Sequence, residues 1–272
     1  MDNSIVTNRK GKGIFKREEW IKESKSLYLS AKLLRQQGGE SRSKISSSKE
    51  RDRSVSDLID IVVATDKSSR LLLGYAFELL LKSAILLMNY GATKNTIYKI
   101  FKSYSHDLQA MVIDLGLTLS NYELELLKLL SQDIVQQARY PIGNVDDDEY
   151  LRIVNERSHN LANKKLFNDM ICLYEKIKSI VVVFDRDVNK CADLNVFRGS
   201  YFTLFMRRGG GLRSRAIVCF TELVSTANKN KKYIKKTIES ECKGLSVFYT
   251  YYWDTFDFYE DTGKCLRELP EQ

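Results

Sequence analysis

The amino-acid sequence predicts a mainly α protein, an up-and-down helical bundle followed by a smaller C-terminal α+β extension. Apolar residues recur at helical spacing in successive segments as far as about residue 185. Only two prolines, Pro141 and Pro270, interrupt the 272 residues, and proline is the residue that most reliably breaks a helix. After Asn189 the pattern changes to aromatic and β-branched residues around glycines, which is typical of strands and turns.

Three regions are expected along the chain. Residues 1–14 contain little that can be buried and should form a mobile basic tail. Residues 15–188 should form the bundle, and residues 189–272 should form the basic extension. Hydrophobic residues make up 43% of the sequence, which excludes a chain that is disordered throughout.

A first helix is expected to begin at Arg17, because the apolar residues that follow fall on one helical face. Gly38 and Gly39 are expected to end this helix. The serine-rich, charged stretch 40–53 has no apolar periodicity, so it is expected to be a flexible loop.

The second helix, over about residues 55–90, is apolar nearly all round in its later half and should be the central, most buried helix. A Ser-x-x-Glu capping box at Ser120 predicts the start of a later helix, which Pro141 ends. Further helical segments are expected over residues 95–101, 108–115 and 164–184.

The extension should contain a hairpin, a helix and a final strand. SYFTLFMRR from Ser200 and LRSRAIVCFTELV from Leu212 are typical of two strands joined by a glycine turn, although the second segment also fits a helix. Lys231–Lys243 should form a basic helix, and LSVFYTYYWDTFDFY from Leu245 should form the last strand.

The sequence argues against a zinc site, a secreted protein and a membrane span. It has five cysteines without a Cys-x-x-Cys pair and only two histidines. The N-terminus lacks the apolar core of a secretory signal, and Glu78 and Lys82 interrupt the richest apolar run. We therefore expect a cytoplasmic protein with reduced thiols that binds no metal, no cofactor and no membrane.

The formal net charge of +8 is unevenly distributed. Residues 1–53 carry +7 and residues 198–243 carry +8, whereas residues 54–197 carry −3 and residues 244–272 carry −4. Basic blocks attract polyanions by Coulomb forces and counterion release, so RNA or another nucleic acid is an expected partner. The alternative is a solvated basic surface without a ligand.

Several polar residues lie inside or at the ends of otherwise apolar helices. Glu78 is the clearest case, because a buried carboxylate is costly unless cations or hydrogen-bond donors surround it. We expect these residues to converge in one cavity of the bundle, and the alternative is that they only tie helix ends together. The candidate pocket comprises Glu78, Lys82, His106, Asp107, Arg139 and Tyr140.

Three segments resemble the HEPN family, the higher eukaryote and prokaryote nucleotide-binding superfamily. They are GYAFELLLKSAILL from Gly74, SHDLQAMV from Ser105, and QQARYP, which ends at Pro141. The resemblance covers residues 17–185, and the remainder resembles no family. It implies an α-helical bundle that is usually dimeric. Many members are metal-independent ribonucleases of toxin–antitoxin, abortive-infection and CRISPR-linked defence systems.

In the nucleases of this family an arginine, four to six other residues and a histidine carry the reaction. The matching positions here are Arg152 and His159, with six residues between them. An imidazole can move a proton to or from RNA, and a guanidinium can stabilise the charge of the phosphorane. The alternative is that His159 is an exposed polar residue in a segment with little apolar content. The resemblance also implies a homodimer and an antitoxin or nucleotidyltransferase partner.

A second basic site is expected at the hairpin turn of the extension, where guanidinium groups could hold phosphates bidentately. The turn lacks the Gly-Lys-Ser/Thr ending of a Walker loop. The competing expectation is that its arginines pair with acidic segments of the chain. The candidate phosphate-binding residues are Arg207, Arg208, Arg213 and Arg215.

The expected function is metal-independent RNA cleavage in a defence or toxin-type system. Family members with the His-Asp-Leu and Arg-Tyr-Pro segments often lack the nuclease motif. A non-catalytic nucleotide or nucleic-acid binding module is therefore the first alternative. A structural dimerisation subunit is the second.

Overall fold

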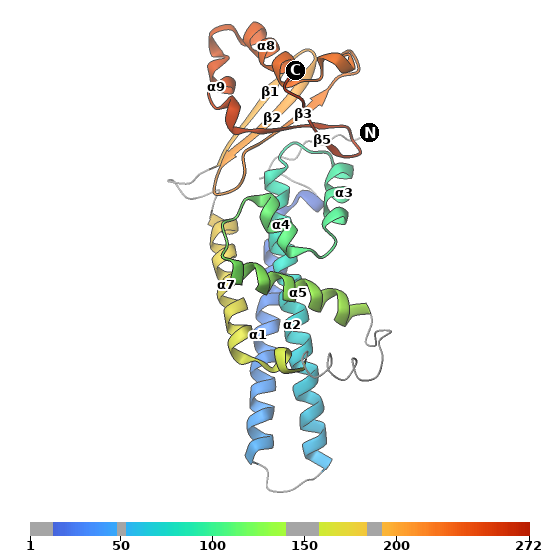
Figure 1. Ribbon diagram of the computed structural model, residues 1–272, viewed down its shortest axis with the longest axis vertical. Helices are drawn as coiled ribbons and strands as arrows, with labels where there is room; N and C mark the ends of the chain where they lie inside the picture. Colours follow the sequence, from blue (N-terminus) through green and yellow to red (C-terminus); the bar gives the residue numbers. More distant parts are fainter. Residues whose placement is uncertain (1–12, 48–52, 140–157, 184–191) are drawn as a thin grey trace.

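Two long antiparallel helices, α1 (Arg17–Ser47) and α2 (Arg53–Met88), form the axis of the protein in the computed structural model (Figure 1). The structure describes residues 13–47, 53–139, 158–183 and 192–272. A short 3-10 helix, η1 (Gly13–Phe15), precedes α1, and the Trp20 indole donates to the Ile14 carbonyl at 2.8 Å. Residues 13 and 14 are thus part of the fold, while residues 1–12 lie outside the described residues.

Helix α1 continues through Gly38 and Gly39, so the expectation that these glycines end it is wrong. A Cβ atom at Gly38 would lie 2.5 Å from the Thr65 hydroxyl oxygen, which shows how closely α1 and α2 approach there. Glycine at this position therefore serves helix packing. Beyond it, an ion pair between Arg42 and Asp66 ties the two helices together.

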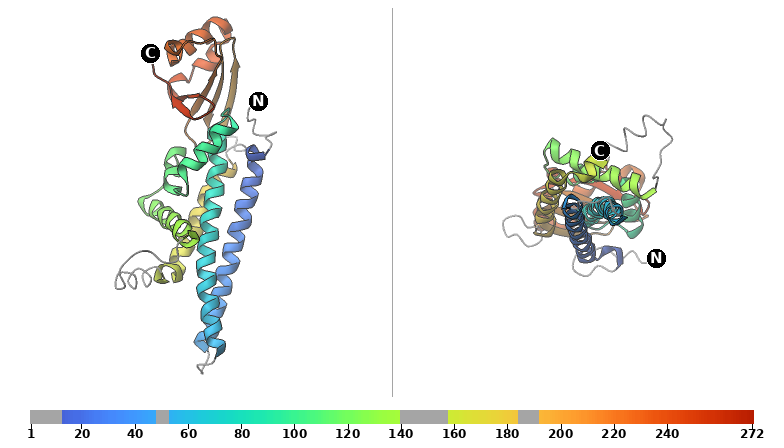
Figure 2. Two further views of the ribbon diagram at one scale, coloured as in Figure 1. Left: turned by 90° about the vertical axis from the view of Figure 1, so that its right-hand side faces the viewer. Right: turned by 90° about the horizontal axis from the view of Figure 1, so that it is seen from below.

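The loop expected over residues 40–53 is correspondingly wrong for residues 40–47, which are helical, and residues 48–52 lie outside the described residues. The hydroxyls of Ser43 and Ser46 donate to backbone carbonyls four residues earlier, at 3.1 and 3.0 Å. Hydroxyl bonds of this kind let serine occupy a helix despite its modest helix propensity. The C-terminal part of α1 and the N-terminal part of α2 project beyond the rest of the molecule as an arm (Figures 1 and 2).

The later half of α2 is the central helix, as expected, and its apolar residues from Ala76 to Met88 are almost all fully buried. Among the described residues, the segment Val55–Met88 is long and apolar enough to cross a membrane, but 72% of its most apolar window is buried inside the protein. The surrounding helices are α3 (Lys94–Tyr104), α4 (Leu108–Leu115), α5 (Asn121–Arg139) and α7 (Lys164–Val183).

The predicted start of α5 is confirmed, because the Ser120 and Glu123 side chains each accept from the other's backbone N–H, at 3.3 and 2.8 Å. Helix α7 runs along α1 and α2, whereas α5 crosses them steeply (Figures 1 and 2). The up-and-down arrangement therefore describes α1, α2 and α7 but not α5.

The C-terminal extension contains a five-stranded sheet in the order β1-β2-β3-β4-β5 within the described residues. Neighbouring strands are antiparallel except for the parallel pair β3 and β4. The strands are β1 (Ala192–Arg198), β2 (Phe202–Gly209), β3 (Arg215–Phe220), β4 (Asp257–Asp261) and β5 (Leu266–Glu268). The expected hairpin is β2 and β3, and the expected basic helix is α8 (Lys231–Cys242).

The final strand is shorter than expected. Only Asp257–Asp261 of the aromatic segment is extended, and the part before it forms η3 (Lys243–Leu245), α9 (Val247–Thr250) and η4 (Trp253–Thr255). Tyr249 and Trp253 of this part pack against the sheet, and the Trp253 ring lies on Phe258 with centroids 4.4 Å apart. Burial of these rings favours short helical turns over a continuous strand.

The sheet joins the end of the bundle. Phe205 and Ile217, on one sheet face, belong to the hydrophobic core of the helices, while the other face forms a second core with α8. Gly91, with φ of 93°, makes this contact possible, because a Cβ atom there would lie 2.1 Å from the Phe205 ring. The Asp261 carboxylate also accepts from the Thr93 backbone N–H at 2.7 Å.

Candidate functional site

Glu78, Lys82 and His106 meet at the side of α2. Glu78 is 5% exposed, and its two carboxylate oxygens contact different partners. The Lys82 ammonium, one turn later on α2, lies 2.5 Å from Oε1, and the His106 Nδ1 lies 2.9 Å from Oε2. These two contacts supply the partners that a buried carboxylate requires.

A tight turn between α3 and α4 brings His106 to this position. The Asp107 N–H donates to the Tyr104 carbonyl at 2.9 Å, and Ser105 has φ of 53° and ψ of −112°. These values are those of the first central residue in a type II′ turn, a position that strongly favours glycine. Asp107 then caps α4 by accepting from the Ala110 N–H at 2.9 Å. Ser105 is strained, and such strain is concentrated at functional sites.

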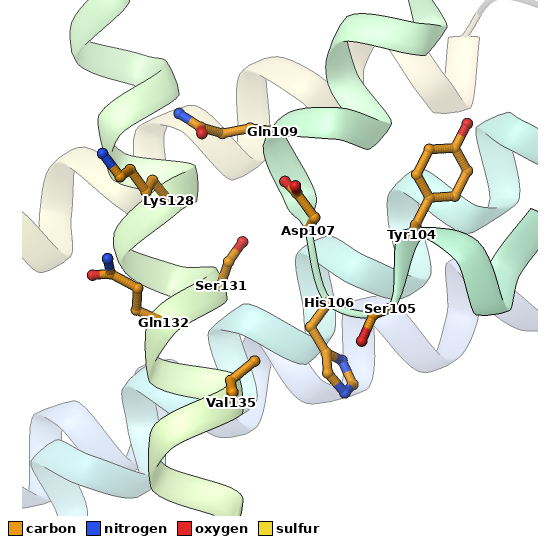
Figure 3. Close-up of a pocket in the computed structure, with 9 residues that line it drawn as sticks. All are labelled: Tyr104, Ser105, His106, Asp107, Gln109, Lys128, Ser131, Gln132 and Val135. Carbon is orange, nitrogen blue, oxygen red and sulfur yellow. The ribbon is translucent and has the colours of Figure 1, made fainter. Parts of the chain in front are cut away.

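An open groove of about 480 Å³ lies between this turn and α5 (Figure 3). Figure 3 shows the turn with His106 on one side and the exposed side chains of α5 on the other. The Ser131 hydroxyl accepts from the Leu108 N–H at 3.1 Å and so joins the two walls. We call this space the His106 groove. It is lined by Tyr104, Ser105, His106, Asp107, Gln109, Lys128, Ser131, Gln132 and Val135.

The groove combines one cation, Lys128, and the Asp107 carboxylate that caps α4 with neutral hydrogen-bonding groups. Lys128 is half exposed and has only a weak 3.6 Å pair with Glu125, so its charge is available to a ligand. Gln109 donates to the Leu124 carbonyl at 2.7 Å, whereas the Gln132 amide makes no hydrogen bond within the described part of the chain. Over the residues that the structure describes, no three His, Cys, Asp or Glu side chains are grouped as metal ligands.

The other residues expected near this pocket are only partly described. Arg139 is the last residue of α5, but its side chain lies outside the description, as do Tyr140 and Arg152. His159 is exposed on a short helical segment, residues 158–162, and does not line the groove. Glu78, Lys82 and His106 are thus in contact, and of these three only His106 lines the groove, together with Asp107.

A buried ionic network that sequence reasoning missed lies beside His159. The Asp66 carboxylate accepts from Arg35 at 2.7 Å, and one turn further along α2 the Arg70 guanidinium lies 2.6 Å from Asp133. Arg35 also donates to the Leu161 carbonyl at 2.6 Å. One signal in the sequence could have revealed this network. Asp66 and Arg70 are four residues apart at the start of the apolar half of α2, a spacing that places both on one helical face.

Two of the four arginines expected to bind phosphate are buried, so the expected four-arginine site is wrong. Arg207 is fully buried and donates to the Gly209 and Arg213 carbonyls at 2.7 and 3.1 Å. Arg215 donates to the Asn89 side chain at 2.7 Å and to Asp114 at 2.9 Å. Burial with several acceptors makes these guanidinium groups structural.

The remaining two arginines are accessible but separate. Arg208 pairs with Asp193 at 2.7 Å and lies 3.3 Å from the centroid of the Tyr252 ring. Arg213 is exposed, and its backbone N–H donates to the Leu115 carbonyl of the bundle at 3.1 Å. The competing expectation was that these arginines pair with the acidic loop or the acidic C-terminus. The acidic partners observed are instead Asp193 for Arg208 and Asp114 for Arg215.

Comparison of the chain with protein-family models, with curated proteins and with solved structures finds no match. The resemblance of residues 17–185 to the HEPN family therefore stays a prediction from the sequence.

Proposed function

We propose that this chain is a HEPN-like RNA-binding protein of the cytoplasm and that the His106 groove holds a single-stranded segment of the RNA. The observation that carries the proposal is the contact of His106 with the buried Glu78 carboxylate at the edge of the groove. Because an ionised carboxylate only accepts hydrogen bonds, the His106 Nδ1–H donates to it, and this contact fixes the orientation of the ring. The Nε2 atom then remains for a ligand.

The groups around the imidazole suit a nucleotide. Lys128 can neutralise a phosphate, and the Gln132 amide can pair with a base edge. Tyr104 and Val135 add apolar surface on either side. The overall charge of +8 favours a polyanion over a neutral ligand.

Replacement of Lys128 by alanine tests this proposal. RNA affinity, measured by fluorescence anisotropy on a labelled single strand, should fall, and the slope of log affinity against log salt should flatten by about 0.7 for one lost phosphate contact. Lys178→Ala is the matched control, because Lys178 also follows a glutamate by three residues on an exposed helix face. Equal affinities and slopes for the two variants would contradict the proposal.

Metal-independent RNA cleavage is the second candidate function. The observation in its favour is that Arg35 and Arg70 bind the carbonyls of Leu161 and Asn160 and so hold the backbone beside His159 while its side chain is exposed. Cleavage of a labelled RNA in EDTA should be lost in His159→Ala and retained in His106→Ala. Cleavage that survives His159→Ala, or none by the native chain, would exclude this function.

A further inference from the structure

The segment after α8 exposes an unusual amount of aromatic surface. Phe248 is 73% exposed and Tyr251 is 72% exposed, although neighbouring Tyr249 and Trp253 pack against the sheet. Large aromatic side chains are normally buried, and an exposed group of them marks a binding surface. The bundle does not cover this segment, since it lies on the far side of the extension (Figure 1).

A pocket of about 160 Å³ opens beneath these rings. Its floor is the β1–β2 pair, in which Asp193 lies opposite Arg208 and Asn195 lies opposite Met206. The walls are the rings of α9 and the turn after it. Drug-sized sites are typically about 300–1,000 Å³, so this pocket suits a single planar ring system. The lining comprises Asp193, Asn195, Met206, Arg208, Phe248, Tyr249, Tyr252 and Phe256.

The polar groups of the pocket are partly engaged and partly free. Arg208 is held by Asp193 at 2.7 Å and by the face of the Tyr252 ring, which fixes both groups before any ligand arrives. Asn195 is exposed and makes no side-chain hydrogen bond to any described residue. A free amide beside fixed aromatic rings can hydrogen-bond the edge of a heterocycle while the rings stack on its face.

The chain that leads into the aromatic segment is rich in lysine. Residues 198–243 carry a net charge of +8, and helix α8 leads through η3 directly into α9. Lys232, Lys235 and Lys236 of α8 form no ion pair with the residues described. Exposed aromatic rings and unpaired lysines are the two features that proteins combine to bind single-stranded nucleic acid.

We propose that the pocket between α9 and the β1–β2 edge takes one unstacked base of single-stranded RNA, which stacks on Phe248 while Asn195 contacts its edge and Tyr252, with Arg208 on its face, forms a wall. The lysines of α8 hold the flanking phosphates. The choice of RNA as ligand rests on the proposed function, but this site is separate from the His106 groove. A duplex keeps its bases stacked, so it should bind more weakly than a single strand.

Removing the rings tests the proposal. Phe248→Ala should weaken binding of a labelled single-stranded RNA by about 5- to 150-fold, because the base–aromatic stack is lost. Tyr252→Ala should weaken it by a smaller factor, because it removes one wall of the pocket and releases Arg208. The salt slope should stay unchanged, since no phosphate contact is removed. Tyr252→Trp keeps a ring and should retain affinity. Tyr98→Ala is the matched control, because Tyr98 is 54% exposed on α3, outside both sites.

Photo-crosslinking adds a readout that does not depend on affinity. An RNA containing 4-thiouridine should crosslink to the tryptic peptide 244–264, which lies between Lys243 and Lys264 and holds all the rings of α9 and the following turn. Wild-type affinity in Phe248→Ala and Tyr252→Ala, or crosslinks that avoid this peptide, would overturn the proposal, as would equal binding of a duplex.

The outcomes separate this site from the groove. Loss of affinity in Lys128→Ala with none in Phe248→Ala and Tyr252→Ala overturns the pocket and leaves the groove. The reverse result overturns the groove and leaves the pocket. A native chain that binds no RNA overturns both.

Discussion

The His106 groove and the contact between bundle and sheet are built from similar residues but differ in their access to water. At the edge of the groove, the Glu78 carboxylate contacts His106, which is 25% exposed, and Lys82, which is 15% exposed. At the contact, which we call the junction (Asn89, Asp114 and Arg215), the Arg215 side chain is 5% exposed. Ionic contacts alone therefore do not identify a ligand site, whereas an ionic contact beside an open groove does.

The two regions share a residue pair. Tyr104 lines the groove, and its hydroxyl donates to the Asp114 carboxylate, whose other oxygen accepts from Arg215. Burial, followed by the bond to Asp114, raises the pKa of Tyr104 far above its usual value, so this hydroxyl stays protonated and keeps donating. Four experiments test how far the groove and the junction differ.

The largest effect is expected at the junction. Arg215→Met should lower the free energy of unfolding by about 3–5 kcal/mol, because it removes one partner of a buried charged contact and leaves the Asn89 side-chain oxygen and one oxygen of the Asp114 carboxylate without the donor they now share. Urea unfolding measures this loss. Arg213→Met, a change at an exposed neighbour, should stay within about 0.5 kcal/mol of the native chain. Similar stabilities of the two variants would show that the junction does not hold the extension.

Glu78→Gln should cost less, about 1–3 kcal/mol, because the amide keeps the shape of the carboxylate and Lys82 can reach water. The same variant should weaken RNA binding, since the amide offers one acceptor oxygen in place of the two that now serve Lys82 and His106. Anisotropy and urea unfolding on one preparation test both parts. A variant with reduced stability and native RNA affinity would make Glu78 a structural residue like Arg215.

Tyr104→Phe removes only the hydroxyl and should cost about 0.5–1.5 kcal/mol. Combined with Arg215→Met, its effect should be non-additive, because both side chains contact Asp114. A double-mutant cycle of unfolding free energies gives the coupling. Additive effects would mean that the groove and the junction act independently.

The smallest effect concerns pH and the start of α5, the helix that forms one wall of the groove. Burial acts to raise the pKa of Glu123, but hydrogen bonds from Lys176 and Ser120 outweigh it, so the pKa falls below its ordinary value of 4.5. A lowered pKa stabilises the fold above pH 4.5, and this contribution is lost as pH falls through the folded-state pKa. Glu123→Gln should therefore flatten the loss of stability with acid below that pH, and an unchanged acid profile would contradict the assignment.

The helices were predictable because their apolar spacing and caps are local. The Ser120 box and the buried half of α2 were found from the sequence alone. Long-range contacts were not accessible in this way. From the sequence alone, Gly38 is expected to end a helix. In the structure it lies inside α1 and allows the close approach of Thr65, which belongs to another helix.

The site residues show the same limit. Glu78 lies among apolar residues in the sequence, which indicated that its carboxylate needs partners, and His106 is one of those partners. The arginines of the hairpin turn look alike in the sequence, yet register places Arg207 and Arg215 inside and Arg208 at the edge. Strand register depends on pairing across the sheet, which local composition does not encode.

The arm formed by α1 and α2 affects how the molecule moves in solution. At 1.5 Å per residue the 36 residues of α2 span about 54 Å, whereas a compact chain of 272 residues has a radius of gyration of about 19 Å. An elongated particle experiences more friction than a sphere of equal mass, so a single chain should elute early in gel filtration. Elution volume would therefore mimic a dimer, and light scattering or equilibrium sedimentation, which report mass without shape, decides whether the expected homodimer exists.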